Sequence, residues 1–285
     1  MLDRRSMIVA VPAALALSAV PAFADDDDGA ALEQKFGGRL GVAALDTGTG
    51  KSLAHRADER FAMCSTFKLL LTAAILHRVD TGDEHLTREI SYTKADLLSH
   101  SPITEARISE GKMTVEALCE AVMAQSDNCA ANLLINALHG PGSVTVYASS
   151  LGDNITRLDR MELDLNRVGP GDERDTTTPA AMLGDLRKIF LGSALSDALR
   201  AKLIAWARGS QNGLRRLRAG LPAGWIVGDK AGTGFGSETN DIAIAWRPKR
   251  APVLITAYYT GSTAPFETRE RVLAEVGRIV ARRFG

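Results

Sequence analysis

One segment of the chain is apolar on nearly every side, and this constrains the fold more than any other feature. Residues 65–79 read as a helix, which the turn residues at 80–83 end with Gly82 as a candidate C-cap. Its side chains leave almost no polar face: Phe67, Leu69, Leu70, Leu71, Ala73, Ala74, Ile75 and Leu76. A helix of this kind belongs in the centre of a hydrophobic core. We therefore expect the other elements to surround it.

A serine and a lysine lie at the start of this mostly apolar helix. Ser65 lies in the first turn and Lys68 follows three residues later, so both side chains project from one face. A buried ammonium is costly unless it has a task. A desolvated lysine can take the proton of a neighbouring serine and make that serine a nucleophile. The pair alone leaves two interpretations open, because a capping serine and a lysine that reaches solvent would look the same.

The first 24 residues have the three parts of an export signal. Arg4 and Arg5 give a positive start, 7–20 is a short apolar run, and Ala-Phe-Ala at 22–24 is an A-x-A cleavage site. We therefore predict a cleaved signal peptide at 1–24, a periplasmic mature protein and no membrane anchor after cleavage. An uncleaved anchor is the alternative. The arginine pair leaves Sec and twin-arginine export both open.

Composition excludes several classes of function. The chain has 34 basic and 34 acidic residues, and this balance does not suggest binding to nucleic acid or to a membrane surface. The five histidines show no paired ligand spacing, so we expect neither a metal nor another cofactor. The three cysteines, Cys64, Cys119 and Cys129, are predicted to be buried thiols, with one disulfide as the alternative.

Strand patterns lie near both ends of the chain and helical patterns lie between them. The expected strands are 39–45, 51–56, 225–231, 242–246 and 253–259. The expected helices are 30–36, 65–79, one capped by Thr114, 129–138, 178–191, 196–207 and one at the C-terminus.

This order predicts an α/β fold with two lobes. Segments 25–60 and 208–285 would form an α/β lobe, an antiparallel sheet flanked by helices, and 61–207 would form an all-helical lobe. A cleft between two such lobes is the natural place for a site. Segment 157–177 has no clear periodicity, and a structureless loop of this length in a compact domain is usually functional.

Three further motifs accompany the serine–lysine pair. Ser126-Asp127-Asn128 lies between two expected helices, and Lys230-Ala231-Gly232-Thr233-Gly234 ends an expected strand. The third, Arg160-Met161-Glu162-Leu163-Asp164-Leu165-Asn166, lies in the long loop. Each motif alone has an ordinary meaning: an Asx-type turn, a strand end before a glycine turn, and a solvated acidic loop. Their order along the chain is specific.

With the motifs in this order, the sequence resembles the class A serine β-lactamases. The resemblance covers nearly the whole mature chain, including 171–179 and 239–243. It implies the serine β-lactamase/transpeptidase-like fold and a monomeric hydrolase. That hydrolase would open the lactam ring of penicillins and cephalosporins, with a small-molecule β-lactam as its partner and no cofactor.

The resemblance implies four catalytic residues. Ser65 attacks the lactam carbonyl, and Ser126 passes a proton to the leaving lactam nitrogen. Lys68 and Glu162, the latter acting through a water, remain alternatives for the base of acylation. Glu162 together with Asn166 would position the water that frees the acyl group.

It also implies the residues that bind substrate. The backbone N–H groups of Ser65 and Thr233 would form the oxyanion hole, and Asn128 would bind the amide side chain of the substrate. Arg216 would supply a carboxylate-binding guanidinium, because Thr239 occupies the strand position that often carries it; a solvated arginine is the alternative. The full implied set is Asn128, Asn166, Lys230, Gly232, Thr233, Arg216 and His100, the last as a wall of the cleft or a plain loop histidine.

Two positions depart from the family pattern. Ala231 stands where a hydroxyl residue usually follows the strand lysine, which removes one hydrogen bond to the substrate carboxylate. Cys64 resembles a cysteine that carbapenem-hydrolysing relatives bridge to the position held here by Gly234, so that bridge cannot form. The sequence leaves the range of substrates and the response to inhibitors open.

Two other functions share the serine, the lysine and the oxyanion hole. A penicillin-binding sensor would stay acylated, and a D,D-peptidase would act on peptidoglycan. Glu162 and its loop distinguish these readings, because only the lactamase needs a second base to free the acyl-serine quickly.

Overall fold

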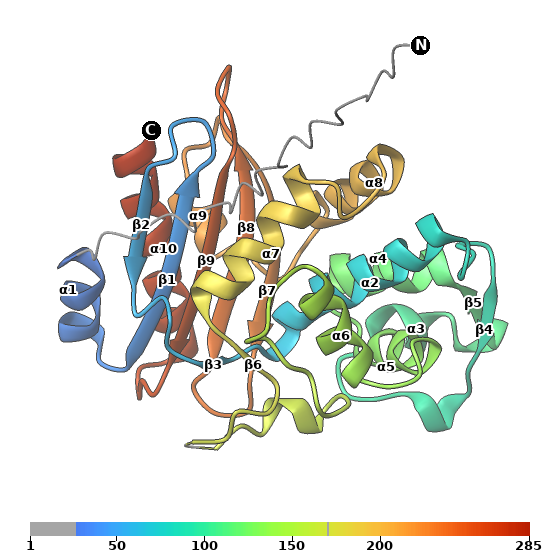
Figure 1. Ribbon diagram of the computed structural model, residues 1–285. Coiled ribbons are helices and arrows are strands. Elements are labelled where there is room, and N and C mark those ends of the chain that lie inside the picture. Colours follow the sequence, from blue (N-terminus) through green and yellow to red (C-terminus); the bar gives the residue numbers. More distant parts are fainter. Residues whose placement is uncertain (1–26, 170) are drawn as a thin grey trace, which may run out of the picture.

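The computed structural model describes residues 27–169 and 171–285 (Figure 1). The predicted signal peptide at 1–24 and its cleavage site lie outside the described residues. Within the described ranges, no helix combines the length and the apolar character that crossing a membrane requires.

A five-stranded antiparallel sheet joins the two ends of the described chain (Figure 1). β1 pairs with β9 along its whole length, and this confirms that strands from both ends share one sheet. β7, which carries the Lys230 motif, is an edge strand. The order across the sheet is β2 (Ser52–His55), β1 (Arg39–Asp46), β9 (Val253–Thr260), β8 (Thr239–Trp246) and β7 (Ile226–Thr233).

Helices cover both faces of the sheet (Figure 1). On one face lie α1 (Asp27–Phe36), the short α9 (Leu217–Gly220) and α10 (Phe266–Phe284), over a core that includes Leu40 and Tyr259. On the other face, α7 (Pro179–Leu191) packs against β1 and β9, and α8 (Asp197–Arg208) packs against β7. The division made from sequence assigns α7 and α8 to the helical lobe, whereas both pack against strands of the sheet.

The predicted central helix is present and buried. It begins with a 3₁₀ turn, η1 (Cys64–Thr66), continues as α2 (Phe67–Thr81) and ends at Gly82, whose φ of 80° is the left-handed C-cap conformation. α2 packs against α4 (Val115–Gln125), α5 (Asn128–Ala137), α6 (Gly142–Ser150) and α8. One hydrophobic core runs from these helices to sheet residues such as Ile242 and Tyr258. The two-lobed α/β fold is therefore confirmed.

Smaller elements complete the helical lobe. Short pairs join β3 (Phe61–Ala62) to β6 (Thr176–Thr177) and β4 (Glu89–Ser91) to β5 (Lys112–Thr114). Along the chain, η2 (Lys94–Asp96), α3 (Pro102–Ala106) and η3 (Ile108–Glu110) lie between β4 and β5. The 3₁₀ turn η4 (Asp164–Asn166) lies within segment 157–177.

Two expectations made from sequence can be compared directly. No sequence pattern indicated α6, because Gly142 begins it and β-branched residues follow; burial of Val144 and Tyr147 holds the helix in place. The cysteines agree with the prediction, since Cys64, Cys119 and Cys129 are all buried and free within the described chain.

Candidate active site

Ser65 lies in η1, where the backbone is held from two sides. The Asn240 side chain of β8 donates hydrogen bonds to the carbonyls of Ala62 and Met63, at 2.8 and 3.1 Å. Gly232 of β7 approaches so closely that a Cβ there would lie 3.1 Å from the Ser65 nitrogen and 2.9 Å from the Met63 oxygen. Only glycine permits this approach. The end of β7 therefore lies directly beside the serine.

Lys68 is fully buried and its ammonium has four polar neighbours. It donates to the Asn128 Oδ1 at 2.5 Å, to the Ser126 carbonyl at 2.8 Å and to the Ser126 hydroxyl at 3.3 Å. Its Nζ also lies 2.9 Å from the Glu162 Oε1, and neither side chain has exposed surface. Three of the four sequence motifs thus meet at this one nitrogen.

Ser126 joins α4 to α5 in an unusual backbone conformation. Its φ of 58° places it in the left-handed region, at the C-cap of α4. The next residue, Asp127, fixes the turn because its buried carboxylate accepts hydrogen bonds from the backbone N–H groups of Ala130 and Thr104. The Ser126 hydroxyl accepts from a second lysine, Lys230, at 3.0 Å.

Lys230 is the second buried lysine of the site. Burial, together with the charge of Lys68, lowers the pKa of Lys230 to about 7. Its ammonium also donates to the carbonyl of Ala231 at 2.8 Å. The Ser126 hydroxyl therefore lies between two lysines, one of which changes charge near neutral pH.

Glu162 is positioned by two asparagines. The Asn132 side chain bonds both backbone groups of Glu162, each at 2.9 Å, and Asn166 donates to its Oε2 at 2.7 Å. Among the described residues, two buried oxygens here accept no hydrogen bond: Glu162 Oε1 and Asn166 Oδ1. The 2.9 Å approach of Lys68 to Oε1 is an ion pair whose angles fall outside those of a hydrogen bond.

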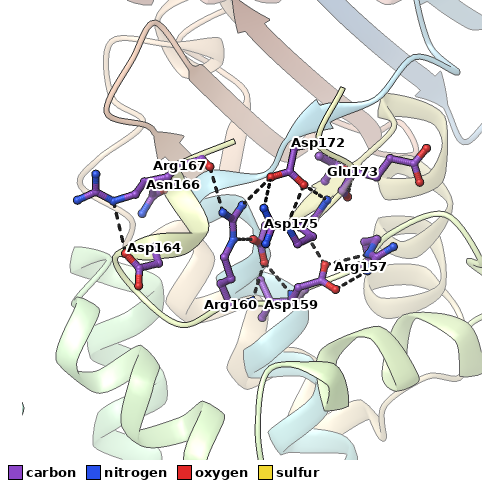
Figure 2. Close-up of polar contacts among 12 residues, drawn as sticks. Arg157, Asp159, Arg160, Asp164, Asn166, Arg167, Asp172, Glu173 and Asp175 are labelled. Atoms are coloured by element: carbon purple, nitrogen blue, oxygen red, sulfur yellow. Dashed lines mark hydrogen bonds and ion pairs between the residues drawn. The ribbon is translucent and has the colours of Figure 1, made fainter. Parts of the chain in front are cut away.

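An ion-pair network gives loop 157–177 its shape (Figure 2). Asp175, which is fully buried, binds the Arg160 Nε at 2.5 Å and accepts from the backbone N–H of Asp159 and of Arg160. Arg160 also donates to the carbonyl of Arg167 and lies near Asp172. The Arg160–Asp175 pair therefore lies in a partly buried network, where it can hold the loop more strongly than an exposed pair would.

Arg216 is buried against β7 and β8 and does not extend into solvent. Its Nη1 donates to the carbonyls of Gly232 and Asn240, both at 2.7 Å, and its Nε lies 3.3 Å from the Glu270 carboxylate. Its Nη2 donates to the Thr233 hydroxyl at 2.7 Å. The alternative of a solvated arginine is wrong, since only 3% of Arg216 is exposed.

Two of the remaining candidates, Thr233 and His100, are exposed, and the third, Asn128, is buried. Thr233 is exposed at the end of β7. His100 is exposed with a φ of 59°, and its ring nitrogen lies 2.8 Å from the Gln125 carbonyl. Asn128 donates its amide to the Ser99 carbonyl at 2.8 Å while its oxygen accepts from Lys68.

Sequence reasoning missed Asn132 and Glu270. Asn132 follows Asn128 by one helical turn on α5, and this i, i+4 spacing was the available signal. Glu270 carried no local signal, because its partner Arg216 lies 54 positions earlier in the chain.

Comparisons with known proteins agree with one another. The model of the beta-lactamase enzyme family matches residues 26–284. Beta-lactamase CTX-M-8 of Citrobacter amalonaticus is 45% identical, with 93% of this chain and 92% of the relative covered. Beta-lactamase OXY-1 of Klebsiella oxytoca is also 45% identical, with 95% and 94% covered.

Solved structures give the same picture. An ancestral Gram-negative class A beta-lactamase superposes with a TM-score of 0.89 at 55% identity, covering 90% of this chain and 99% of its own. A putative class A beta-lactamase, PenP from Rhodopseudomonas palustris, gives a TM-score of 0.88 at 50% identity, with 90% and 98% covered.

Proposed function

The chain belongs to the class A β-lactamases and is a β-lactam hydrolase; from this premise we propose that it opens penicillins and cephalosporins through an ester on Ser65. The observation that carries the proposal is that Ser126 and Glu162 both contact the buried ammonium of Lys68, which follows that serine by three residues. Family membership decides against the sensor and D,D-peptidase alternatives.

Acylation begins when the Ser65 oxygen attacks the lactam carbonyl and gives up its proton. Two groups are candidate acceptors: Glu162, acting through a water, and Lys68 once its ammonium has given a proton to Glu162, whose Oε1 lies 2.9 Å away. The developing oxyanion would be held by the backbone N–H groups of Ser65 and Thr233. The close packing of Gly232 against Ser65 supports this, because it brings the two backbone segments together.

Collapse of the tetrahedral intermediate breaks the bond between the carbonyl carbon and the lactam nitrogen. The nitrogen needs a proton as it leaves, and the Ser126 hydroxyl would supply it. Lys68 and Lys230 both donate to that hydroxyl, so either could return a proton to Ser126. The product of this half-reaction is the ring-opened acyl ester of Ser65.

Deacylation requires a water molecule aimed at the ester carbonyl. Glu162 Oε1 and Asn166 Oδ1 support this step, because buried oxygens of this kind attract a hydrogen-bond donor. Glu162 would remove one proton from that water, and the Ser65 oxygen would regain a proton as the ester breaks. Asn132 acts as a positioning residue by fixing the backbone of Glu162.

Recognition of the substrate carboxylate would fall to Lys230 and Thr233. Arg216 acts through Thr233: its Nη2 donates to the Thr233 oxygen, which leaves the hydroxyl proton free to point at the substrate. Asn128 would bind the amide side chain, and His100 would form part of the wall beside it. Gly232 contributes by its lack of a side chain.

The proposed cellular location of the enzyme rests on the sequence alone. We propose export by the signal peptide at 1–24 and a monomeric enzyme in the periplasm, where β-lactams meet their targets. N-terminal sequencing of exported protein tests the cleavage near Asp25, and a start at Met1 would contradict it.

The test of the function uses purified protein and one variant. Wild type should hydrolyse benzylpenicillin and a cephalosporin, while Ser65→Ala should fold normally and show neither turnover nor a covalent adduct by mass spectrometry. Covalent acylation of Ser65→Ala would overturn the assignment of the nucleophile.

A further inference from the structure

A cavity separate from the active site lies between α6 and the start of loop 157–177. Its volume is about 420 Å³, which is within the range that small organic ligands occupy. α6 provides one wall through Thr145 and Ser149, and segment 154–159 together with Arg60 provides the other. None of the four proposed catalytic residues lines this space. We call it the α6 cavity.

Two arginines give the α6 cavity a positive wall. Arg60 donates from Nη1 to the Ile155 carbonyl at 2.9 Å and to the Thr176 hydroxyl at 3.0 Å. Arg157 pairs with the Asp159 carboxylate through Nε and Nη2, at 2.9 and 2.5 Å (Figure 2). Within the described ranges, the Arg60 Nη2 and the Arg157 Nη1 donate no hydrogen bond to the protein. Each guanidinium therefore keeps one terminal nitrogen for a ligand.

The charges of the lining favour a ligand with one negative charge. Arg60 and Arg157 are cationic and Asp159 is anionic, so the lining carries a net charge of +1. A second negative charge on the ligand would meet the Asp159 carboxylate. Glu173 lies 3.7 Å from the Arg60 Nε, but its side chain is 62% exposed, so water screens its charge. The planar guanidinium matches a carboxylate in shape and in hydrogen-bond donors.

The rest of the lining accepts a short apolar group beside that charge. Leu158 is buried, and Ile155 is an apolar side chain left 41% exposed. The Thr145 hydroxyl accepts from the Leu158 N–H at 2.9 Å and donates to the Leu158 carbonyl at 3.3 Å, which fixes the two walls against each other. A ligand that covers Ile155 removes apolar surface from water. An aromatic or aliphatic group of a few carbons would therefore add to binding.

The wall of the α6 cavity is bonded directly to the residue that shapes loop 157–177. The Asp159 N–H donates to the Asp175 carboxylate at 2.7 Å, and the Asp159 carboxylate accepts from the Asp175 N–H at 3.2 Å. The Asp175 carbonyl in turn accepts from the N–H of Met63 at 3.0 Å, two residues before Ser65. A ligand that draws Arg157 away from Asp159 changes the bonding of the carboxylate that holds Asp175.

We propose that the α6 cavity binds a small organic monocarboxylate and that its occupation slows turnover at the active site. The carboxylate would lie on Arg157 and Arg60, and the apolar part would lie against Ile155 and Leu158. The first half of the proposal stands on the cavity alone. The second half rests on the proposed function, because it acts through the loop that carries Glu162.

The probe for binding is 3-phenylpropionate, titrated into ¹⁵N-labelled protein and followed by amide chemical shifts. The dissociation constant should be about 1 mM, as expected for a ligand of this size. The largest shifts should fall on Ser149, Asn154 and Ile155. The neutral analogue 3-phenylpropanol has the same ring and chain length and should bind at least about tenfold more weakly, because it lacks the charge that the arginines recognise.

Two variants and a control locate the site. Arg157→Gln removes a cation, and Ser149→Glu places a carboxylate at the exposed mouth of the cavity, so each should weaken binding by about tenfold. Arg174→Gln removes another exposed arginine of the loop, one that pairs with Asp172, and should bind as wild type does. Wild-type affinity in both Arg157→Gln and Ser149→Glu, or shifts confined to the surroundings of Lys230, would overturn the cavity as the site.

The effect on turnover is measured with benzylpenicillin at saturating 3-phenylpropionate. Wild type should lose about two- to tenfold in kcat with KM little changed, and Arg157→Gln should lose less at the same probe concentration. A rise in KM with kcat unchanged would show competition at the active site and overturn the coupling. Failure of wild type to hydrolyse benzylpenicillin without the probe would overturn the proposed function, and the titration would still decide whether the cavity binds the carboxylate.

Discussion

The hydroxyl of Ser126 accepts a 3.0 Å hydrogen bond from the ammonium of Lys230, on the opposite lobe. This bond links the helical lobe to the edge strand of the sheet, and Lys68 of α2 donates to the same hydroxyl at 3.3 Å. A hydroxyl with two buried ammonium donors is well placed to pass protons, because each donor can replace the proton that it gives up.

Ser126→Ala should therefore lose the step that protonates the leaving nitrogen. We expect kcat/KM for benzylpenicillin to fall by about 10²- to 10⁴-fold, the scale of a positioned proton donor. Steady-state kinetics measure this loss. Ser149→Ala, an exposed serine on α6, is the matched control and should behave as wild type. A loss below tenfold in Ser126→Ala would mean that another group delivers the proton.

A hydroxyl introduced at position 231 should partly replace the hydroxyl of Thr233. Alternate residues of a strand project from the same face, so Ala231 and Thr233 of β7 lie on one side. Thr233→Val should raise KM for penicillins by about tenfold, since a hydrogen bond to a charged carboxylate is lost. Ala231→Thr should lower KM, or raise kcat/KM, and should recover part of the loss in the double variant.

Steady-state kinetics of the three variants decide the matter. An Ala231→Thr enzyme with unchanged or lower kcat/KM would show that Thr233, held by Arg216, already fills the role.

The low pKa of Lys230, about 7, predicts two different pH profiles. Lys230 loses its charge as pH rises through this value. The neutral amine then attracts the substrate carboxylate less strongly. In the complex, the bound carboxylate favours the ammonium. The profile of kcat/KM, which reports the free enzyme, should therefore decline from about pH 7, while kcat stays level to higher pH. Lys230→Arg should extend the kcat/KM plateau, because arginine stays charged. A flat kcat/KM profile to pH 9 in wild type would contradict this account.

A buried pair of carboxyl groups predicts how stability depends on pH. Asp185 of α7 lies close to Asp153, and among the described residues each has one buried oxygen, Oδ2, that takes part in no hydrogen bond. Burial, and then the charge of Asp153, raise the pKa of Asp185 well above its usual value, although Lys188 opposes this. The folded protein thus holds a proton that the unfolded chain releases above about pH 4. The stability that this proton provides is present at low pH and is lost as pH rises through the folded-state pKa.

Asp185→Asn removes the buried acidic group and offers an amide N–H to Asp153 without taking up a proton. The variant should have a higher Tm than wild type at pH 8, by about 2–4 °C, and a smaller advantage at pH 5. Tyr147 of α6 and Tyr258 of β9, whose pKa values the charge of Asp185 affects, are unchanged in this comparison. Thermal unfolding at both pH values measures the difference. An equal Tm difference at pH 5 and pH 8 would show that the pair does not share a proton.

Local sequence patterns predicted the helices and strands whose formation depends mainly on neighbouring residues. The apolar helix from 65 to 79, its Gly82 cap and the five strands followed from side-chain periodicity and turn residues. The motif order gave the family. α6 was missed because burial of Val144 and Tyr147, and not helix propensity, keeps it helical.

The contacts that sequence reasoning did not foresee join residues far apart in the chain. Arg216 holds the Thr233 hydroxyl and is itself held by Glu270, and nothing near any of the three predicts the others. The contact between the Arg167 guanidinium and the Phe235 ring is of the same kind. Such pairs depend on the tertiary packing of distant segments, and one sequence contains no record of that packing.

Glu162→Ala tests the central claim, that one carboxylate separates hydrolysis from permanent acylation. Acylation should survive at reduced rate, because Lys68 remains beside the serine. Deacylation should fall by several orders of magnitude, since the variant lacks the base that activates the water. Asp164→Ala is the control, because that carboxylate is exposed and pairs with Arg167.

The measurement is mass spectrometry of Glu162→Ala mixed with benzylpenicillin, beside stopped-flow kinetics. The account predicts a burst of one equivalent and a stable adduct on Ser65 with the mass of the opened lactam. Steady turnover close to wild type, with no adduct, would contradict it.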